Sequence, residues 1–364
     1  MKYINRYLKL SLITPDIAGF AGSGGVYKFN ADWKITFNVR KASSATFLSF
    51  NEAEISIWNM TERVRRKIAQ AGCMVVLDAG YEKKHGQIFN GLVSNIVTTK
   101  NGPDIVTTLY CMSDQAKYYK PIEQTARNVA VKDLIVQLCE NVGASYQVSH
   151  LQELAGQIVN RSYSGPFSKV IAMICADYKI YVGLDNGFLD FRDKKETAEN
   201  ILPEDVRVFT PNTGMIGNPQ VTETGVDIKN LIVPDIRVND YFKLQADYAA
   251  YNLSELTRTP NKVLGGELNA FQFIDTHSYN GIFMALSINF MGDTRGNEWS
   301  VGIQGSRIWN KNKAEQLSAG AGPKGKILSA KRAKQTELTL IMYKKWRECT
   351  RRIWRTLRRC LTFV

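Results

Sequence analysis

The sequence predicts a mainly β protein with an α+β insertion: two β-rich parts flank a small module of helices and strands. Three observations support this prediction. Apolar residues alternate with polar ones before residue 115 and again after residue 210. Between these two parts, apolar residues recur at the three- and four-residue steps of helices. Lysines and arginines gather beyond a glycine-rich connector, which predicts a separate basic helix.

These patterns divide the chain of 364 residues into five parts. A chain of this length exceeds one average domain, so two or three globular domains are expected, each able to bury its own core. Two β-rich parts on either side of an insertion suggest two related β-barrels. The expected parts are a first β-barrel domain (1–115), an inserted α+β module (116–209), a second β-barrel domain (210–310), a linker (311–335) and a basic amphipathic helix (336–364).

Composition excludes several classes of protein. The hydrophobic content of 44% is ordinary, and no apolar run approaches the ~20 residues that span a bilayer. The N-terminal residues lack an uninterrupted apolar core and a cleavage site, so we expect a strand through Leu8, Leu10 and Leu12 and no signal peptide. The six cysteines are scattered among apolar neighbours, which indicates folding in a reducing cytoplasm without a disulfide framework or zinc cluster.

The first β-rich part contains the most informative pattern of the chain. Ile55 and Ile57 alternate with polar neighbours, as in a half-buried strand, and Thr61 is placed to cap a helix of about three turns. An apolar strand at 73–77 follows and leads into a corner at 78–81.

Further strands complete this first part. Residues 88–97 and 104–111 predict a hairpin, because Asn101-Gly102 supplies the positive φ that a tight turn needs. Upstream, the segment 35–39 is another clean alternation of apolar and polar residues.

Residues 121–199 change character. Helical spacing predicts helices over 129–141 and 168–178, the first of them ended by Gly143, and Asn186-Gly187 predicts a hairpin after the second. The helices match at an offset of about 36 residues. This match is either a weak internal duplication or two amphipathic helices that are each followed by a strand.

The second β-rich part shows the same alternation as the first. Strands are expected within 230–244 with a break at Pro234, and at 271–274, 282–290 and 299–303.

At these residues a family resemblance becomes visible. Four motifs resemble the first tube domain of baseplate hub proteins, which occur in contractile-tailed bacteriophages and related injection machines. They are Asn51-x-Ala-Glu-Ile-x-Ile-Trp-Asn59, Asp78-Ala-Gly-Tyr81, Ile88-Phe-x-Gly91 and Cys111-x-x-Asp114. A second patch, Gly217–Gly225 followed by Leu231–Leu244, is similar to the opening of the family's second tube domain. With the inserted module, the resemblance covers roughly residues 1–310.

The resemblance implies a structural baseplate hub with two tube-type β-barrel domains and a module that decorates the outside of the tube. The resembled proteins form homotrimers, which present six similar units to a sixfold tail tube protein and three to a central spike protein. Other implied partners are further baseplate proteins and, as an additional candidate, the tape measure protein. Nucleic acid is expected only as the genome in transit. The implied location is the virion tail baseplate, after folding and assembly in the host cytoplasm.

No set of residues predicts catalysis. His85, His150 and His277 lie in separate regions among loop-like residues, without a nucleophile or carboxylate at a catalytic spacing. The glycine-rich segment 19–25 lacks the Lys-Ser/Thr pair and the helix of a phosphate-binding loop. We therefore expect no enzymatic activity, no cofactor and no metal ion.

The net charge of +13 is concentrated at the C-terminal end. Residues 331–364 contain 11 Lys/Arg and 2 Glu, an excess of +9, so the other 330 residues carry only +13 − 9 = +4. A second interpretation of the whole chain is a β-barrel nucleic-acid-binding protein with this segment as its basic arm. The nearly balanced charge of residues 1–330 argues against it.

The basic segment predicts a cationic amphipathic helix. Its apolar stripe and its arginines give a set of candidate docking residues: Trp346, Arg347, Arg351, Ile353, Trp354, Arg355, Leu357 and Arg358. Such a helix can dock in a partner's groove, lie on an anionic membrane, neutralise nucleic acid, or pack back on its own chain.

Overall fold

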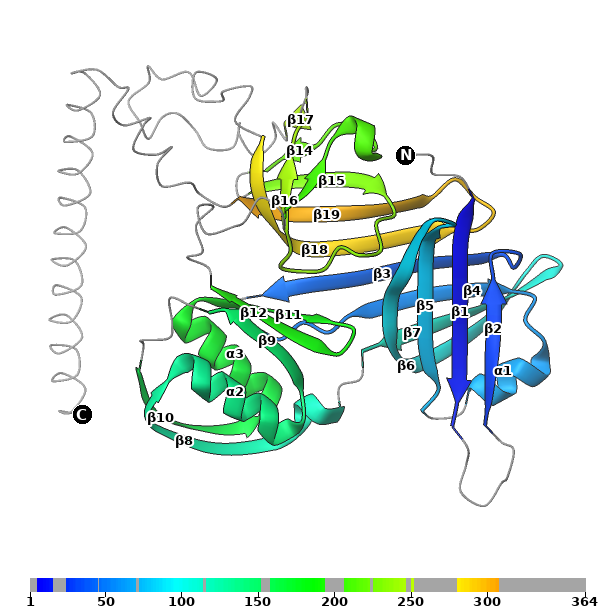
Figure 1. The fold of residues 1–364 in the computed structure, drawn as a ribbon. Helices are drawn as coiled ribbons and strands as arrows, with labels where there is room; N and C mark the ends of the chain where they lie inside the picture. The colour runs from blue at the N-terminus through cyan, green and yellow to red at the C-terminus, as the bar shows by residue number, and fades with distance from the viewer. Residues whose placement is uncertain are drawn as a thin grey trace, which may run out of the picture. The chain divides into compact units, whose positions relative to one another are not determined.

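The computed structural model describes stretches of one unit of the chain, Met1–Ile308. They are residues 5–15, 24–44, 46–69, 72–113, 116–151, 158–193, 206–222, 225–246, 250–251 and 280–307. Strands dominate them, so the fold is mainly β, as the sequence predicts (Figure 1). Within these stretches, no helix is long and apolar enough to cross a membrane.

The first β part is an antiparallel sheet with the strand order β2-β1-β5-β6-β7-β4-β3. Its elements are β1 (Arg6–Thr14), β2 (Gly25–Asn30), β3 (Ile35–Ser44), β4 (Glu52–Trp58), α1 (Glu62–Ile68), β5 (Met74–Tyr81), β6 (Lys84–Asn101) and β7 (Asp104–Met112). Period-two alternation sends Leu8, Leu10 and Leu12 of β1 and Ile55 and Ile57 of β4 into one core. Gly102 turns β6 into β7 with φ +62°, which confirms the predicted hairpin.

The inserted module has a core of its own. Its elements are β8 (Pro121–Ala130), α2 (Val131–Val142), β9 (Ser145–His150), β10 (Ile158–Pro166), α3 (Phe167–Tyr178), β11 (Ile180–Asp185) and β12 (Phe188–Asp193). The two helices lie between the β8–β10 pair and the strands β9, β12 and β11 (Figure 1). Both predicted helices are confirmed, and Gly143 ends α2 in the left-handed conformation.

The match between the two halves of the module extends beyond the helices. Each helix follows one long strand and precedes another, so that β8-α2-β9 and β10-α3-β11 are two strand–helix–strand units. Their first strands pair with each other in antiparallel register. The sequence did not predict β8 or β10, because their exposed pair of strands carries few apolar residues.

The second β part adds seven further strands to the described fold. They are β13 (Arg207–Phe209), β14 (Gln220–Val221), β15 (Gly225–Leu231), β16 (Tyr241–Leu244), β17 (Ala250–Tyr251), β18 (Gly281–Asp293) and β19 (Trp299–Arg307). β18 pairs with β19 along one edge, and along its other edge first with β16 and then with β3 of the first part. The predicted segment 271–274 lies outside the described residues.

The expectation of two separate β-barrels needs correction. Through the β3–β18 pairing, strands of both β parts belong to one large, mostly antiparallel sheet. Among the described strands, no series of pairings returns to its starting strand, so neither part closes into a barrel on its own. Local alternation predicts strands but not their partners, and residues about 250 positions apart make this joint.

Two local predictions also differ from the structure. The stretch 78–81 is not a corner: β5 continues through it to Tyr81, and the irregularity is a register shift between Leu77 and Asp78. The helix α1 spans seven residues, so it is shorter than the predicted three turns. Thr61 does occupy its N-cap position, but its side chain makes no capping hydrogen bond.

Candidate assembly surface

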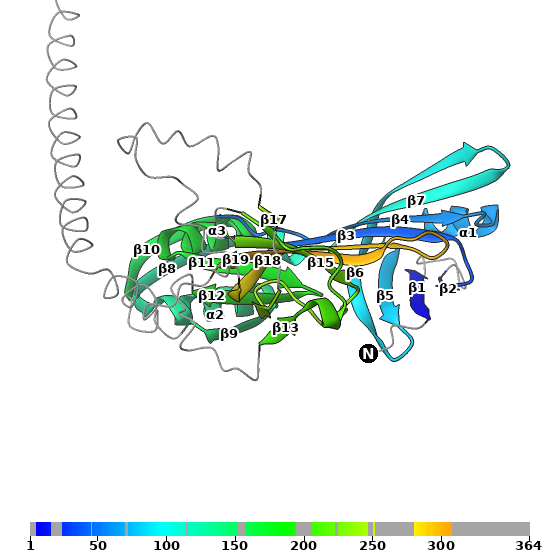
Figure 2. The ribbon, with the colours of Figure 1, turned by 90° about the horizontal axis from the view of Figure 1, so that it is seen from above.

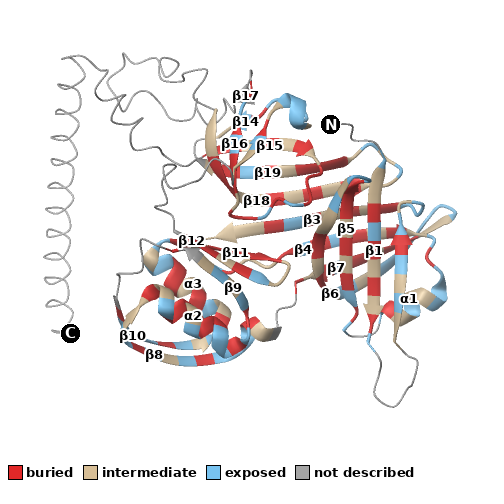
Figure 3. Ribbon diagram, viewed as in Figure 1, coloured by how far each residue is buried: buried red, intermediate tan, exposed pale blue. Residues whose placement is uncertain are grey.

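The sheet that joins the two β parts has one apolar and one polar face. At the joint, Val39 of β3 lies opposite Phe290 of β18, and both side chains are fully buried in the shared core. Along β3 and β18, buried residues alternate with less buried ones (Figure 3). On the other face, Arg40 lies opposite Asn289 and Asn38 lies opposite Met291. The alternation therefore continues across the joint without interruption, so the two parts present one common surface.

The polar face carries charges of both signs. Glu52 and Glu54 of β4 are exposed beside Arg40, while Asp227 and Lys229 lie on β15 at the far side. Burial raises the pKa of Asp227 above its ordinary value. Charges of both signs are interspersed on this face, with exposed lysines at Lys9, Lys28 and Lys243, unlike the uniformly basic surfaces that bind nucleic acid.

Part of this face is hollowed. A shallow pocket of about 270 Å³ is lined by Asn38, Arg40, Glu52, Glu54 and Tyr110, among others. Its lining comes from β3, β4, β6 and β7, so it belongs to the first part of the sheet.

The two β parts repeat one strand arrangement. The spatial order β5-β6-β7-β4-β3 of the first part corresponds to β16-β18-β19-β15-β14 of the second. The order along the chain corresponds as well: β3, β4, β5, β6, β7 in the first part and β14, β15, β16, β18, β19 in the second. The parts are therefore two versions of one β unit, with α1 present only in the first.

An irregularity at the same place in both parts fixes this correspondence. The β6–β7 register shifts between Val93 and Asn95, and the β18–β19 register shifts between Ala285 and Ser287. Each shift follows directly after the pairing with β5 or β16 has ended. Shared bulges are specific features of a strand, so they align the two units residue by residue.

The two units differ in what lies on their outer edges. β18 is covered by β3, but the equivalent stretch of β6 from Asn95 to Asn101 pairs only with β7 among the described strands. The β6–β7 hairpin extends beyond its neighbours (Figure 2). On the opposite side of the double sheet, β14 carries only the two-residue strand β17.

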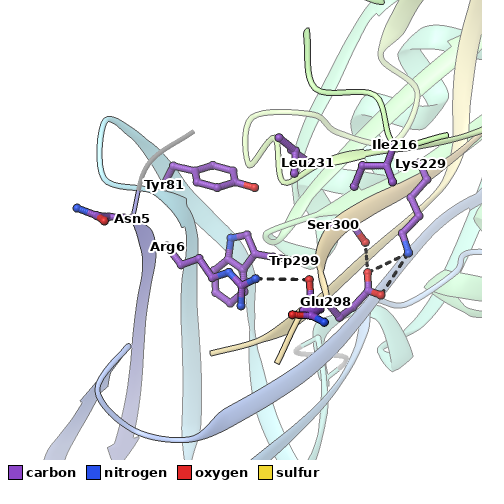
Figure 4. Close-up of a pocket in the computed structure, with 10 residues that line it drawn as sticks. Asn5, Arg6, Tyr81, Ile216, Lys229, Leu231, Glu298, Trp299 and Ser300 are labelled. Carbon is purple, nitrogen blue, oxygen red and sulfur yellow. Dashed lines mark hydrogen bonds and ion pairs between the residues drawn. The ribbon is translucent and has the colours of Figure 1, made fainter. Parts of the chain in front are cut away.

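A second contact between the β parts surrounds a pocket of about 530 Å³ (Figure 4). The Arg6 guanidinium of β1 donates hydrogen bonds to the carbonyl oxygens of Asp293 at 2.7 Å and Gly296 at 2.5 Å. It also lies 5.3 Å from the Trp299 ring, whose indole N–H donates to the Gly80 carbonyl oxygen at 3.0 Å. Arg6 thus holds the β18–β19 turn against the first part.

The far side of the same pocket is an ion pair on the second part. Lys229 lies 3.1 Å from Glu298, which also accepts a hydrogen bond from Ser300. The Ser300 hydrogen bond lowers the pKa of Glu298, and Lys229 lowers it further against the raising effect of burial.

Buried charges attach the inserted module to both β parts. Lys41 of β3 pairs with Asp185 of β11, and their side chains are only 2% and 10% exposed. Arg237 of the second part lies 3.5 Å from the same carboxylate. Beside them, β11 pairs with the end of β3 at two positions, Val182 with Ser44 and Gly183 with Ser43.

A neighbouring group of charges continues this attachment. Arg192 of β12 lies 2.9 Å from Asp190 and 3.8 Å from Asp240, and its guanidinium lies 4.8 Å from the Tyr241 ring. Burial raises the pKa of Asp240, although the Arg237 backbone N–H and Arg192 act against it. The main apolar cores of the module and the β parts are separate, so these charges fix how the module sits together with a small apolar cluster of Tyr181, Tyr241 and Met284.

Sequence reasoning missed this charged contact, although Lys41 carried a signal. Lys41 continues the buried alternation of Ile35, Phe37 and Val39, where a charged side chain requires a buried partner. The identity of that partner, Asp185, follows only from the tertiary structure, because 144 positions separate the two residues.

The residues considered for chemistry lie apart from one another. His85 is exposed at the β5–β6 turn, where its ring stacks on Tyr7 with 3.7 Å between the ring centroids. His150 lies at the end of β9, and His277 is outside the described residues. Within the described stretches, no group of three or more His, Cys, Asp or Glu side chains is placed to hold a metal ion.

The described cysteines lie in the two cores, as their apolar neighbours predicted. Cys73, Cys111, Cys139 and Cys175 are buried and free. Burial raises the pKa of the Cys73 thiol to about 11 and those of Cys111 and Cys139 to about 12. Such thiols stay protonated at neutral pH and are therefore unreactive.

The predicted docking residues of the basic segment lie outside the described residues. This applies to Trp346, Arg347, Arg351, Ile353, Trp354, Arg355, Leu357 and Arg358.

The described residues thus contain a doubled β unit with one common polar face. Comparison with protein families identifies the class. The family model described as "Baseplate hub gp41" matches residues 18–249, more than half of the chain. The chain belongs to the baseplate hub gp41 family and is a structural component of a phage tail baseplate.

Solved structures resemble the fold at very low sequence identity. A tail protein from Neisseria meningitidis MC58 shares 8% identity with a TM-score of 0.48, over 83% of this chain and 98% of that protein. The 43 kDa tail protein of prophage MuSo2 from Shewanella oneidensis shares 11%, with the same TM-score and the same coverage. The E. coli c3393 protein, a type VI secretion component, shares 7% with a TM-score of 0.45, over 76% of this chain and 74% of that protein. No curated protein sequence matches the chain significantly.

Proposed function

We propose that this hub protein assembles into a homotrimeric ring that adapts the sixfold tail tube to the threefold central spike. The observation that carries the proposal is the repeated strand arrangement of the two β parts. Three chains with two similar β units each supply six similar units around one axis. One tube interface can then repeat six times, while features that occur once per chain repeat three times.

The module is the feature that occurs once per chain. It is attached to both β parts through Lys41, Asp185 and Arg237. In the ring, this module decorates the outside and marks the threefold symmetry. Together with α1, which belongs to the first unit, it distinguishes the two β units and gives a spike a threefold reference.

The polar face of the double sheet lines a channel for genome passage. Its apolar face is committed to the core, so the face with Glu52, Glu54 and Arg40 is the one available to water. Interspersed charges of both signs provide no continuous basic surface to hold DNA phosphates. The same balance argues against the alternative function, a nucleic-acid-binding protein that grips its ligand along this sheet.

The barrel expected from the sequence exists, in this proposal, at the level of the ring. Six β units placed edge to edge close one large barrel, in place of two small barrels within each chain. The tail tube protein and the central spike protein bind its two ends. Other baseplate proteins and the tape measure protein are further partners, and the chain folds in the host cytoplasm without enzymatic activity.

End-on electron micrographs of the purified full-length chain test this proposal. We expect rings with a central channel, six similar inner lobes and three outer lobes from the modules. Rings without the threefold outer lobes, or particles without a channel, would contradict it.

The basic C-terminal segment is proposed as an attachment helix. Trp346, Ile353 and Leu357 would bury in a neighbouring tail protein or hub chain, and the arginines would steer the helix to an acidic patch. Because glycines of the linker separate this segment from the body, the body does not need it to fold.

Truncation after Gly325 should therefore leave a folded trimer that attaches poorly to tails. Replacing Trp346 and Ile353 together with Ala should cause most of the same loss, since buried anchors dominate such contacts at ~2 kcal/mol or more each. Tail assembly assays at two salt concentrations measure the effect, with Arg359→Ala as a control outside the docking set. An unfolded truncated body, or unchanged tail assembly, would refute the proposal.

A further inference from the structure

We infer that the ring closes by strand addition, in which the outer edge of β6 in one copy pairs antiparallel with β14 of the next copy and replaces β17 there. The inference rests on the proposed ring and names the edges and the register that would form it. It is carried by the β3–β18 joint, which is a direct view of how one β unit adds to another.

The joint within the chain supplies the template. β18 of the second unit adds to β3 of the first, with Arg40 opposite Asn289 and Val39 opposite Phe290. In the repeated arrangement, β18 corresponds to β6 and β3 corresponds to β14. The same contact between copies therefore joins β6 to β14.

The register shifts in β6 and β18 show which residues of these two strands correspond to each other. Ser287 and Asn95 each follow the register shift of their strand. Counting on from them, Phe290 corresponds to Thr98 and Met291 to Thr99.

The cross-strand partners of β3 and β14 show which residues of these two strands correspond to each other. Ala53 pairs with both Val39 and Cys111, and Val226 pairs with both Val221 and Gly305. Cys111 and Gly305 occupy the same place beside the two bulges. Val39 therefore corresponds to Val221 and Asn38 to Gln220. The inferred antiparallel register places Thr98 opposite Val221, and Thr99 opposite Gln220.

The chemistry of the β6 edge suits strand addition. Ile96, Val97, Thr98 and Thr99 form a β-branched run, the residue type that strands favour, and Val97 is 40% exposed. An exposed edge of this kind is an aggregation hazard unless a partner covers it. A second copy is the partner that the repeated fold provides.

Among the described strands, only the short strand β17 pairs with the outer edge of β14. It pairs in parallel over only two residues, in a sheet whose other neighbours on this side are antiparallel. The incoming β6 offers the whole stretch from Asn95 to Asn101. Since each copy uses β6 on one side and β14 on the other, the contact is head-to-tail, and it closes into a ring of three when each copy is rotated by one third of a turn.

Cysteine pairs test the register in the full-length chain, with Cys349 and Cys360 replaced by Ser. Thr99→Cys with Gln220→Cys should give covalent dimers and trimers on non-reducing denaturing gels after mild oxidation or treatment with dibromobimane. The matched positive control is Asn38→Cys with Met291→Cys, which occupies the equivalent positions within one chain and should link internally. Thr98→Cys with Gln220→Cys places the thiols on opposite faces and should stay unlinked.

The outcomes separate this inference from the proposed function. A trimer by light scattering whose test pair fails to link, while the internal control links, would overturn the strand addition and leave the ring in place. Linking of the offset pair in preference to the test pair would overturn the register. A chain that remains monomeric at micromolar concentration would overturn both proposals.

Discussion

Asp185→Asn should destabilise the protein by about 3–5 kcal/mol, because it removes the buried partner of Lys41 and leaves an ammonium group without compensation. The substitution keeps the size of the side chain and the turn that follows it. Urea unfolding, monitored by circular dichroism, measures the loss. Unfolding should begin at a lower urea concentration than in the unsubstituted protein, since the module loses its attachment to both β parts.

Exposed charges provide the control for this result. Arg161 and Asp177 form a 2.6 Å pair whose side chains are 54% and 45% exposed. Asp177→Asn should therefore change the free energy of unfolding by ~1 kcal/mol or less. Adding Lys41→Met to Asp185→Asn should recover part of the loss, because the unpaired charge is removed. Equal effects of Asp185→Asn and Asp177→Asn would contradict the assigned role.

Phe290→Ala should cost about 3–5 kcal/mol, because the ring fills the fully buried core at the joint of the two β units. Phe290 lies opposite Val39, and the Lys41 ammonium lies 5.7 Å from its ring. A cavity at this point loosens both the joint and the attachment of the module. Trimer assembly should therefore weaken together with stability.

Phe188→Ala is the matched control, since this phenylalanine is 51% exposed on β12. It should shift the urea midpoint little and leave the trimer intact. If both variants behaved alike, the β3–β18 joint would not be the central element of the fold. Urea unfolding and light scattering on the same samples decide between these results.

The strands could be predicted from the sequence wherever one face is buried. In β3 and β4, apolar side chains alternate strictly, and that pattern depends only on the period of a strand. The module helices were equally visible, because Leu134 and Leu138 follow helical spacing and Gly143 ends α2. These features are local, so the order of residues is sufficient to reveal them.

The pairing of the strands could not be predicted in the same way. The local pattern predicts a buried strand position for Val39 and another for Phe290, but nothing local indicates that the two residues face each other. The repeat of the β unit is hidden for a similar reason. Equivalent positions carry residues as different as Cys111 and Gly305 or Phe290 and Thr98, so the similarity resides in strand order and bulges.

The assembly surface was therefore only partly predictable. Resemblance to the hub family suggested two β units, whereas the charged contact of Lys41 with Asp185 and the uncovered edge of β6 emerge from the tertiary structure. Both depend on residues that are distant in sequence.

The molar mass of the purified full-length chain in solution tests the central claim most directly. Size-exclusion chromatography with light scattering, at micromolar concentration and physiological salt, should give three times the chain mass of 41.0 kDa, about 123 kDa. A single species of 41.0 kDa under these conditions would contradict the hub ring, and with it the proposed match between two β units per chain and a sixfold tube.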